Sequence, residues 1–247
     1  MDPLTILLLV GGGLVAGFVN TVAGGGSVVT LPILIEAVGL PATVANGTNR
    51  VAILLQNVAG VSGYRHGGVL EPRRVLPVLP ATLVGAALGA FAPTQISPEA
   101  MRKDFAFDIV LVALSVVVKP QRWLEGSESR LTEPWRSLAF LGIGFYGGFV
   151  QAGVGFLLLA GLVFGTGFDL VKGNAAKVFL VLLYTPVTLF LFWRAGQVAW
   201  VAGLVLASGN VSGALLASWL AVKKGAGWIR GVLVVAAIAA ALRMLLV

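Results

Sequence analysis

The chain has 247 residues, of which 58% are hydrophobic and only 11% are charged, and its formal net charge is +7. Soluble domains carry roughly 25% charged residues, so this composition excludes an ordinary soluble protein and is typical of a chain embedded in a lipid bilayer. The basic residues are spread through short loops between apolar runs, which favours a role in membrane topology over nucleic-acid binding.

Ten apolar segments follow one another along the chain. A helix needs about 20 residues to cross the hydrocarbon core, and several of the segments reach that length. The second and seventh are shorter, and each follows a Gly-rich break, which predicts half-helices or re-entrant hairpins. The predicted segments are 4–20, 27–38, 44–64, 74–92, 105–118, 135–151, 156–168, 173–193, 198–222 and 228–247.

A long polar stretch, residues 119–134, separates two halves that resemble each other. Residues 17–20 (Gly-Phe-Val-Asn) correspond to residues 148–151 (Gly-Phe-Val-Gln), and residues 46–51 correspond to residues 173–178. Any single match is weak, but the matches keep their order along the chain. The pattern predicts a first membrane repeat at 1–118, a linker at 119–134 and a second membrane repeat at 135–247.

The basic loops predict how the two repeats are oriented. With ten passes, the loops at 65–74, 119–136 and 223–230 fall on one side, which should be the cytoplasm. Each half then has an odd number of passes, about five, so the second lies upside down relative to the first. The predicted fold is an all-α polytopic membrane protein with two inverted repeats and broken helices, a pattern typical of secondary transporters in the cytoplasmic membrane.

The break after the first segment contains three consecutive glycines beside polar side chains. Consecutive glycines let backbone amides approach a ligand closely, and the positive end of the following helix favours an anion. The alternative is that these glycines only allow tight helix packing. The candidate binding residues here are Asn20, Thr21, Gly24, Gly25, Gly26 and Ser27.

A second polar group, Asn46-Gly47-Thr48-Asn49-Arg50, lies near the start of the third segment, where Asn46 or Thr48 could cap the helix. Arg50 keeps its charge, and an unpaired cation inside the bilayer is costly, so it usually marks a ligand path. The alternative is that Arg50 extends to the interface. Lys177 holds the matching position of the second half, which favours anion contact or gating by this pair.

Other polar residues in the segments either line a path or form interhelical hydrogen bonds. These residues are Gln56, Asn57, Thr82, Tyr184, Thr185, Ser208 and Asn210. Glu36, Asp108 and His66 either relay a proton or are wetted near the interface.

Signatures of an enzyme are missing. A single histidine cannot build a multi-histidine metal site, and no cysteine, paired buried acids or P-loop is present. The sequence therefore predicts a protein that is not an enzyme and that needs no cofactor or metal.

Several motifs resemble the first half of the TauE/SafE sulfite exporter family, also called the toluene sulfonate uptake permeases. They are residues 17–27 (GFVNTVAGGGS), Leu31-Pro32, residues 45–50 (ANGTNR) and residues 63–67 (GYRHG). Residues 153–155 and 173–177 are similar to the looser second repeat of that family. The resemblance covers nearly the whole chain.

The resemblance implies a carrier that moves sulfite, sulfonates or related anions across the cytoplasmic membrane, commonly outward. Such an anion suits amide, hydroxyl and guanidinium donors. Carried over residue by residue, the motif points to the candidates above and adds Gln151, Asn174 and Lys177 from the second half. Ala175 and Ala176 replace the groups that Thr48 and Asn49 provide, which argues against an exact two-fold site.

Other functions stay open at this point. The chain could carry another small anion, such as thiosulfate or a carboxylate, or it could be a membrane accessory protein that transports nothing. A metal cation is disfavoured because carboxylates are scarce in the apolar segments. The sequence leaves open the exact substrate, the direction, the coupling ion (a proton or sodium) and whether the chain forms a homo-oligomer.

Overall fold

The computed structural model describes residues 1–97, 99, 101 and 131–246, with side chains described as far as Val235 in the last helix. Regular structure within these residues is helical, which confirms the predicted all-α class. The predicted segment 105–118 and residues 119–130 of the predicted linker lie outside the described residues.

The first half of the chain forms a long helix, a break, a short helix and a second long helix. The short helix α2 passes directly into a π-helical turn, η1, before the chain enters α3. These elements are α1 (Pro3–Val22), α2 (Ser27–Pro32), η1 (Ile33–Ala37) and α3 (Ala42–His66). They are followed by α4 (Pro72–Val75), η2 (Leu76–Val78), α5 (Leu79–Phe91) and η3 (Ala92–Gln95).

The same order of elements recurs after residue 131. A helix, a break, a short helix with a π-helical turn and another helix of 25 residues follow one another. They are α7 (Trp135–Phe149), α8 (Val154–Ala160), η4 (Gly161–Gly165) and α9 (Leu170–Arg194), followed by α10 (Trp200–Leu246). This order agrees with a duplication, while the inverted relationship of the halves stays a prediction.

The helices are long and apolar enough for a multi-pass membrane protein. Four candidate spans, at Pro3–Val22, Pro72–Gln95, Leu170–Arg194 and Trp200–Val235, are found among the described residues. Residues 198–222 and 228–247, predicted as separate segments, share the label α10, but a kink at Gly225 (φ 72°, ψ −165°) divides it into two helices, in agreement with that prediction.

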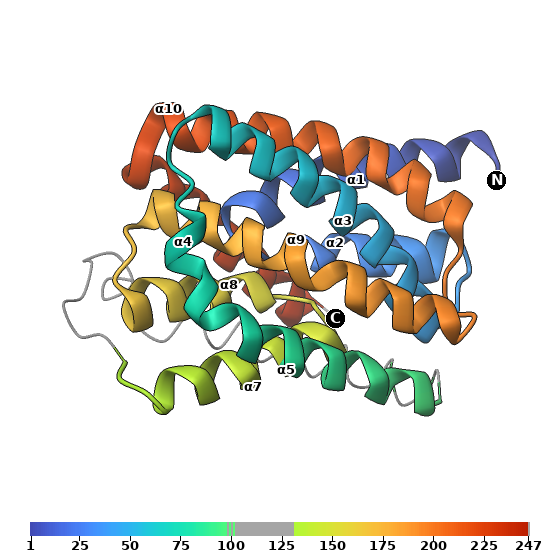
Figure 1. Ribbon diagram of the computed structural model, residues 1–247. Coiled ribbons are helices and arrows are strands. Elements are labelled where there is room, and N and C mark those ends of the chain that lie inside the picture. The colour runs from blue at the N-terminus through green and yellow to red at the C-terminus, as the bar shows by residue number, and fades with distance from the viewer. Residues whose placement is uncertain (98, 100, 102–130, 247) are drawn as a thin grey trace.

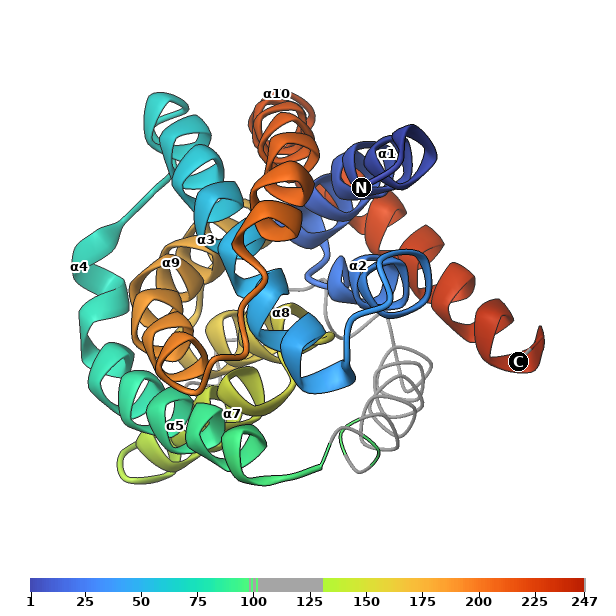
Figure 2. The same ribbon diagram turned by 90° about the vertical axis from the view of Figure 1, so that its right-hand side faces the viewer.

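Glycines bring two pairs of helices into close contact. Gly17 of α1 lies against the backbone of Asn210 in α10, and Gly148 of α7 lies against the backbone of Ala86 in α5, so a Cβ at either glycine would overlap its neighbour. Small residues allow such close approach in membranes. The first helix of each half therefore packs against a helix of the other half, α1 on α10 and α7 on α5, with α3 and α9 between the two pairs (Figure 2).

Basic residues gather at one end of the helix bundle. The end of α3 and the starts of α4, α7 and α9 lie together at the left of Figure 1. An ion pair of 2.6 Å joins Lys172 of α9 to Glu71 before α4, and Gly67 packs against Val222 of α10. The basic loops around 65–74 and 223–230 therefore share one end, as their charge predicted; most of the loop at 119–136 lies outside the described residues.

Candidate functional site

The two predicted helix breaks are confirmed, and they meet inside the bundle. The chain leaves α1 at Ala23 and enters α2 at Ser27, while α7 and α8 are separated by residues 150–153. Gly24 has a φ of +97° and lies against Gly155, where a Cβ on either residue would overlap the backbone of the other. The tip of each broken pair therefore touches the tip of the other.

A small polar cavity lies beside this contact. Its volume is about 10 Å³, which is space for roughly one water molecule. Its lining comes from both breaks and from the middle of α3 and α9, and consists of Asn20, Asn57, Gln151, Val154, Gly155, Lys177 and Val181.

Lys177 of α9 joins its helix to the end of α1. Its Nζ donates to the carbonyl oxygens of Asn20 (3.1 Å) and Thr21 (3.0 Å) and to Oδ1 of Asn174 (2.7 Å). The two carbonyls belong to the last turn of α1, where no further helical amide is available to them. Lys177 is 2% exposed, so its charge is held inside the protein.

Arg50 of α3 does the same for the end of α7. Its Nη atoms donate to the carbonyl oxygens of Gly147 (3.3 Å) and Gly148, and to Thr188 (3.1 Å) and Asn46 (3.4 Å). The guanidinium lies 4.6 Å from the centre of the Phe192 ring. Arg50 is 0% exposed, which excludes the alternative that its side chain extends to the interface.

Neither buried cation has a carboxylate partner among the described residues. The ion pairs within these residues involve only Glu71 and Glu133, both near the basic end of the bundle. Burial of a cation without a counter-charge is expensive, and hydrogen bonds to carbonyl oxygens offset only part of that cost. The centre of the described structure therefore carries excess positive charge.

Buried polar groups without partners lie in the cavity wall, at Gln151, and on residues next to the lining residues Asn20 and Lys177. Gln151 adopts a positive φ of 68° and is 3% exposed, and neither Nε2 nor Oε1 of its amide has a hydrogen-bond partner. Thr21 Oγ1 and Asn174 Nδ2 are buried and unpartnered in the same way. Since unpartnered buried polar groups are uncommon in folded proteins, their concentration here is typical of a ligand site.

Backbone amides add to this donor set. Within the described residues, no hydrogen bond is formed by the amides of Gly25 and Gly26 in the first break, or by those of Ala152 and Gly153 in the second. These amides immediately precede α2 and α8, where helix geometry leaves donors free. Gly25 approaches only the ring of Phe156, whereas Gly26 packs tightly on Ala16 of α1. The packing interpretation of the glycines therefore holds for Gly24 and Gly26.

Three of the predicted site residues form structural hydrogen bonds instead. Asn49 donates to Ser27 Oγ (3.0 Å) and accepts from Thr30 (2.8 Å), which fastens α2 to α3. Thr48 Oγ1 accepts from the amide of Ala199 (2.9 Å), just before α10. The structure therefore brings Asn20, Gln151 and Lys177 to the cavity and places Ser27, Thr48 and Asn49 in contacts between elements.

Two further polar residues contribute to the site. Asn57, expected either to line a path or to form an interhelical hydrogen bond, lines the cavity, and its Nδ2 donates to the carbonyl of Ile53 (2.7 Å), which leaves its Oδ1 available. Asn46 holds Arg50 and also donates to the carbonyl of Phe149 at the end of α7 (2.7 Å). Asn57 lies seven residues, or two helical turns, after Arg50, on the same face of α3.

Among the other polar residues of the spans, the predicted interhelical hydrogen bond is found between Asn210 and Gln56, whereas the hydroxyls bond within their own helices. Thr82 and Thr185 donate to carbonyls one turn earlier in their own helices. The side-chain amides of Asn210 and Gln56 lie 2.9 Å apart and connect α10 to α3. Glu36 is exposed, in line with a wetted position, and Asp108 lies outside the described residues.

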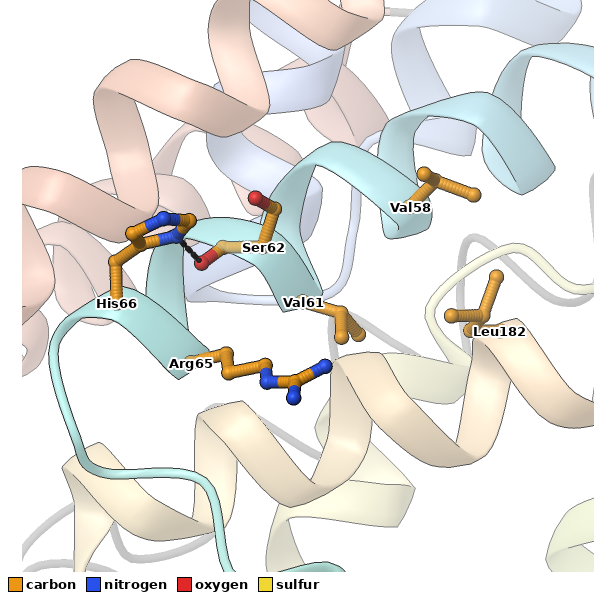
Figure 3. A pocket seen from close by; sticks show the side chains of 6 residues that line it. All are labelled: Val58, Val61, Ser62, Arg65, His66 and Leu182. Atoms are coloured by element: carbon orange, nitrogen blue, oxygen red, sulfur yellow. Dashed lines mark hydrogen bonds between the residues drawn. The ribbon is translucent and has the colours of Figure 1, made fainter.

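A larger cleft opens between α3 and α9 on the side of the basic end. It has a volume of about 530 Å³ and is lined by Val58, Val61, Ser62, Arg65, His66 and Leu182. Figure 3 shows Arg65 extending toward α9, while Nδ1 of His66 lies 2.8 Å from the Ser62 carbonyl oxygen of its own helix. Asn57 and Val181 of the central cavity directly precede Val58 and Leu182 of the cleft in sequence. The cavity and the cleft are therefore both lined by neighbouring positions of α3 and α9.

Comparison with known proteins places this chain in a family. The family model described as sulfite exporter TauE/SafE matches residues 9–244, nearly the whole chain. No solved structure matches the chain.

Curated relatives from several bacteria match over similar lengths. A probable membrane transporter protein, ORF9, from a Sinorhizobium species is 31% identical over 94% of this chain and 88% of its own length. A probable membrane transporter protein of Haemophilus influenzae is 28% identical over 95% of this chain and 91% of its own length. The probable membrane transporter protein YfcA of Escherichia coli K12 is 27% identical over 95% of this chain and 87% of its own length.

Proposed function

We propose that this chain, which belongs to the TauE/SafE sulfite exporter family of membrane transporters, is a secondary transporter that exports a sulfur oxyanion or an organosulfonate. The proposed substrate is sulfite-like, with several acceptor oxygens around one sulfur atom, and the proposed location is the cytoplasmic membrane. The protein acts as a carrier and not as an enzyme.

The observation that carries the proposal is the buried cation Lys177 in the same cavity wall as the amide of Gln151, with a second buried cation, Arg50, on the neighbouring helix α3. Arg50 and Lys177 have no carboxylate partner among the described residues, and the Gln151 amide forms no hydrogen bond of normal geometry, with the Tyr184 hydroxyl as a polar neighbour. A bound anion would supply the missing negative charge and accept hydrogen bonds from Gln151 Nε2. A cation or a neutral solute would leave the positive charge unbalanced.

The places where the cations bind also favour an anion electrostatically. The carboxyl end of a helix carries a partial negative charge, which would repel an anion from the ends of α1 and α7. Lys177 and Arg50 offset that charge by binding the last carbonyls of the two helices. The free amides before α2 and α8 and the side-chain amide of Gln151 are then the donors available to an anion at the breaks.

Transport requires this site to open. A cavity of about 10 Å³ is far smaller than a sulfite ion, and the contact between Gly24 and Gly155 closes it. We take the structure as a closed state, in which separating the two tips would admit the anion. Rocking of two inverted repeats against each other would open the site toward each side in turn, with the cleft at Arg65 as the approach from the basic end.

Flux through reconstituted proteoliposomes tests the substrate. Vesicles should carry sulfite or an organosulfonate well above the protein-free rate, and the flux should be lost with Gln151→Leu and kept with Arg194→Gln. Arg194 is an exposed cation that forms no ion pair within the described residues, so it serves as a matched surface control. A proton gradient and a sodium gradient, imposed separately, would identify the coupling ion.

Each alternative has its own outcome in the same assay. Flux of only thiosulfate or only a carboxylate would replace sulfite as the substrate. Absence of both flux and thermal stabilisation by every anion would favour a non-transporting accessory protein. Export is read in cells loaded with sulfite, where the native chain should lower the intracellular concentration relative to Gln151→Leu.

A further inference from the structure

A second pocket lies at the basic end of the bundle, away from the central cavity. It has a volume of about 640 Å³ and is formed by the start of α4, the turn η2, the start of α7 and the loop before α9. Three of its lining residues are arginines. The lining consists of Arg73, Arg74, Pro77, Val78, Arg136, Thr166 and Gly167.

Two of the arginines are held in fixed positions by their neighbours. Arg74 donates to Glu71 (2.8 Å) and to the carbonyl oxygens of Thr166 (3.4 Å) and Gly167 (3.3 Å), and its guanidinium lies 4.1 Å from the centre of the Phe168 ring. Arg136 pairs with Glu133 across one helical turn, at 2.6 Å. An anion entering the pocket would therefore meet guanidinium groups that are already oriented.

The third arginine and the charge balance leave the pocket positive. Arg73 is exposed and forms no hydrogen bond or ion pair with the described residues. Glu71, the carboxylate next to it, is shared between Arg74 and Lys172. Four cations (Arg73, Arg74, Arg136 and Lys172) thus face three carboxylates (Glu71, Glu133 and Asp169), for a net charge of +1 among these side chains.

Apolar side chains beside the pocket point to a lipid as its occupant. Arg73 lies at the start of the candidate span Pro72–Gln95. The neighbours of the lining residues in sequence include Leu76, which is 52% exposed, and Trp135, which is 67% exposed. A large exposed tryptophan beside basic residues is typical of the level of lipid headgroups. A soluble anion would use the arginines but would leave these apolar surfaces unused.

We propose that this pocket binds the phosphate headgroup of an anionic phospholipid, with the acyl chains lying along the apolar surface next to Leu76 and Trp135. Arginine clusters suit phosphate because the planar guanidinium can donate two parallel hydrogen bonds. Basic pockets between helices on the cytoplasmic side are places where such headgroups bind. The proposal is independent of the substrate of the central cavity.

Thermal unfolding of the purified protein in mixed micelles tests the proposal. Phosphatidylglycerol should raise the melting temperature by about 3 °C over the same amount of phosphatidylcholine, because a ligand that binds only the folded state stabilises it. Inorganic phosphate at equal concentration should give no shift, which separates a lipid from a free anion. A shift with inorganic phosphate equal to that with phosphatidylglycerol would overturn the lipid assignment.

Matched variants test whether the phosphatidylglycerol shift arises from binding in this pocket. Arg73→Gln should lose at least half of the phosphatidylglycerol shift, while Arg194→Gln, which removes the same charge from the other end of α9, should keep it. Arg73 has no partner to lose, so its melting temperature in phosphatidylcholine should match that of the native chain. A full lipid shift in both Arg73→Gln and Arg136→Gln, or an equal loss in Arg194→Gln, would refute the site.

Discussion

Arg50 and Lys177 each bind the broken helix of the other half of the chain. Arg50 of α3 donates to the carbonyls of Gly147 and Gly148 at the end of α7, and Lys177 of α9 donates to those of Asn20 and Thr21 at the end of α1. Each cation therefore caps the carboxyl end of a helix in addition to supplying a positive charge. Substitutions at these positions will change both stability and transport, so the two effects have to be measured separately.

Arg50→Met should destabilise the protein and stop transport. Two buried carbonyls lose their donors, at about 1–3 kcal/mol each, so the free energy of unfolding should fall by about 2–5 kcal/mol. Arg50→Lys should give an intermediate result, because a single ammonium cannot reach all four acceptors of the guanidinium. Melting temperature and sulfite flux, measured on the same preparations, test both variants. Native stability in Arg50→Met would contradict the helix-capping role.

Gln151→Leu should weaken anion binding without lowering the stability of the protein. The amide of Gln151 forms no hydrogen bond of normal geometry, with the Tyr184 hydroxyl as a polar neighbour, and replacing an unpartnered buried polar group by an apolar one of similar size is neutral or stabilising. The melting temperature should therefore stay within about 2 °C of the native value or rise. Anion affinity, measured by calorimetry, should fall at least tenfold. Native affinity in a stable Gln151→Leu protein would remove this residue from the site.

Gly24→Ala should prevent the two broken pairs from meeting. Its Cβ would overlap the backbone of Gly155, and its φ of +97° is unfavourable for alanine. The substitution should lower stability by more than about 3 kcal/mol and reduce the yield of folded protein in detergent. Gly142→Ala in α7 is the matched control, because its Cβ meets nothing within 4 Å; it should be neutral or slightly stabilising. Equal effects of the two substitutions would show that the tip contact is not required.

Glu71 should make stability depend on pH at the basic end. Hydrogen bonds from Lys172 and then Arg74 lower the pKa of its carboxyl below the ordinary value of 4.5. Its contribution is therefore complete above pH 4.5 and is lost as the pH falls through the lowered pKa. The side chain is partly exposed, so the contribution should be less than about 1 kcal/mol.

Melting curves between pH 7 and pH 3 test this prediction. Glu71→Gln should lower the melting temperature slightly at neutral pH and should flatten its decline in acid. Glu36→Gln is the control, because Glu36 is exposed and forms no ion pair within the described residues. A decline in acid that is equally steep in Glu71→Gln and in the native chain would contradict the assignment.

The sequence alone determined the features that depend on local chemistry. Hydropathy placed the helices, because a bilayer requires long apolar segments, and glycines marked both breaks, at 24–26 and at 153 and 155, because glycine disfavours helix. The matching positions of Arg50 and Lys177 could also be recognised, because a charged residue within an apolar segment is evident from the sequence alone. The loops at 65–74 and 223–230 lie at a common end, in line with their basic residues.

Only the tertiary structure decided what each polar side chain binds. Thr48 and Asn49 stand in the motif next to Arg50, yet they hold α10 and α2 in place, while Asn57, for which the sequence left two roles open, reaches the cavity. Arg50 and Lys177 find their carbonyl partners 97 and 157 residues away along the chain. Hydrogen-bond partners at such separations are set by how whole helices pack. Local pattern therefore selects the residues that carry charge, and packing decides which donors remain free for a ligand.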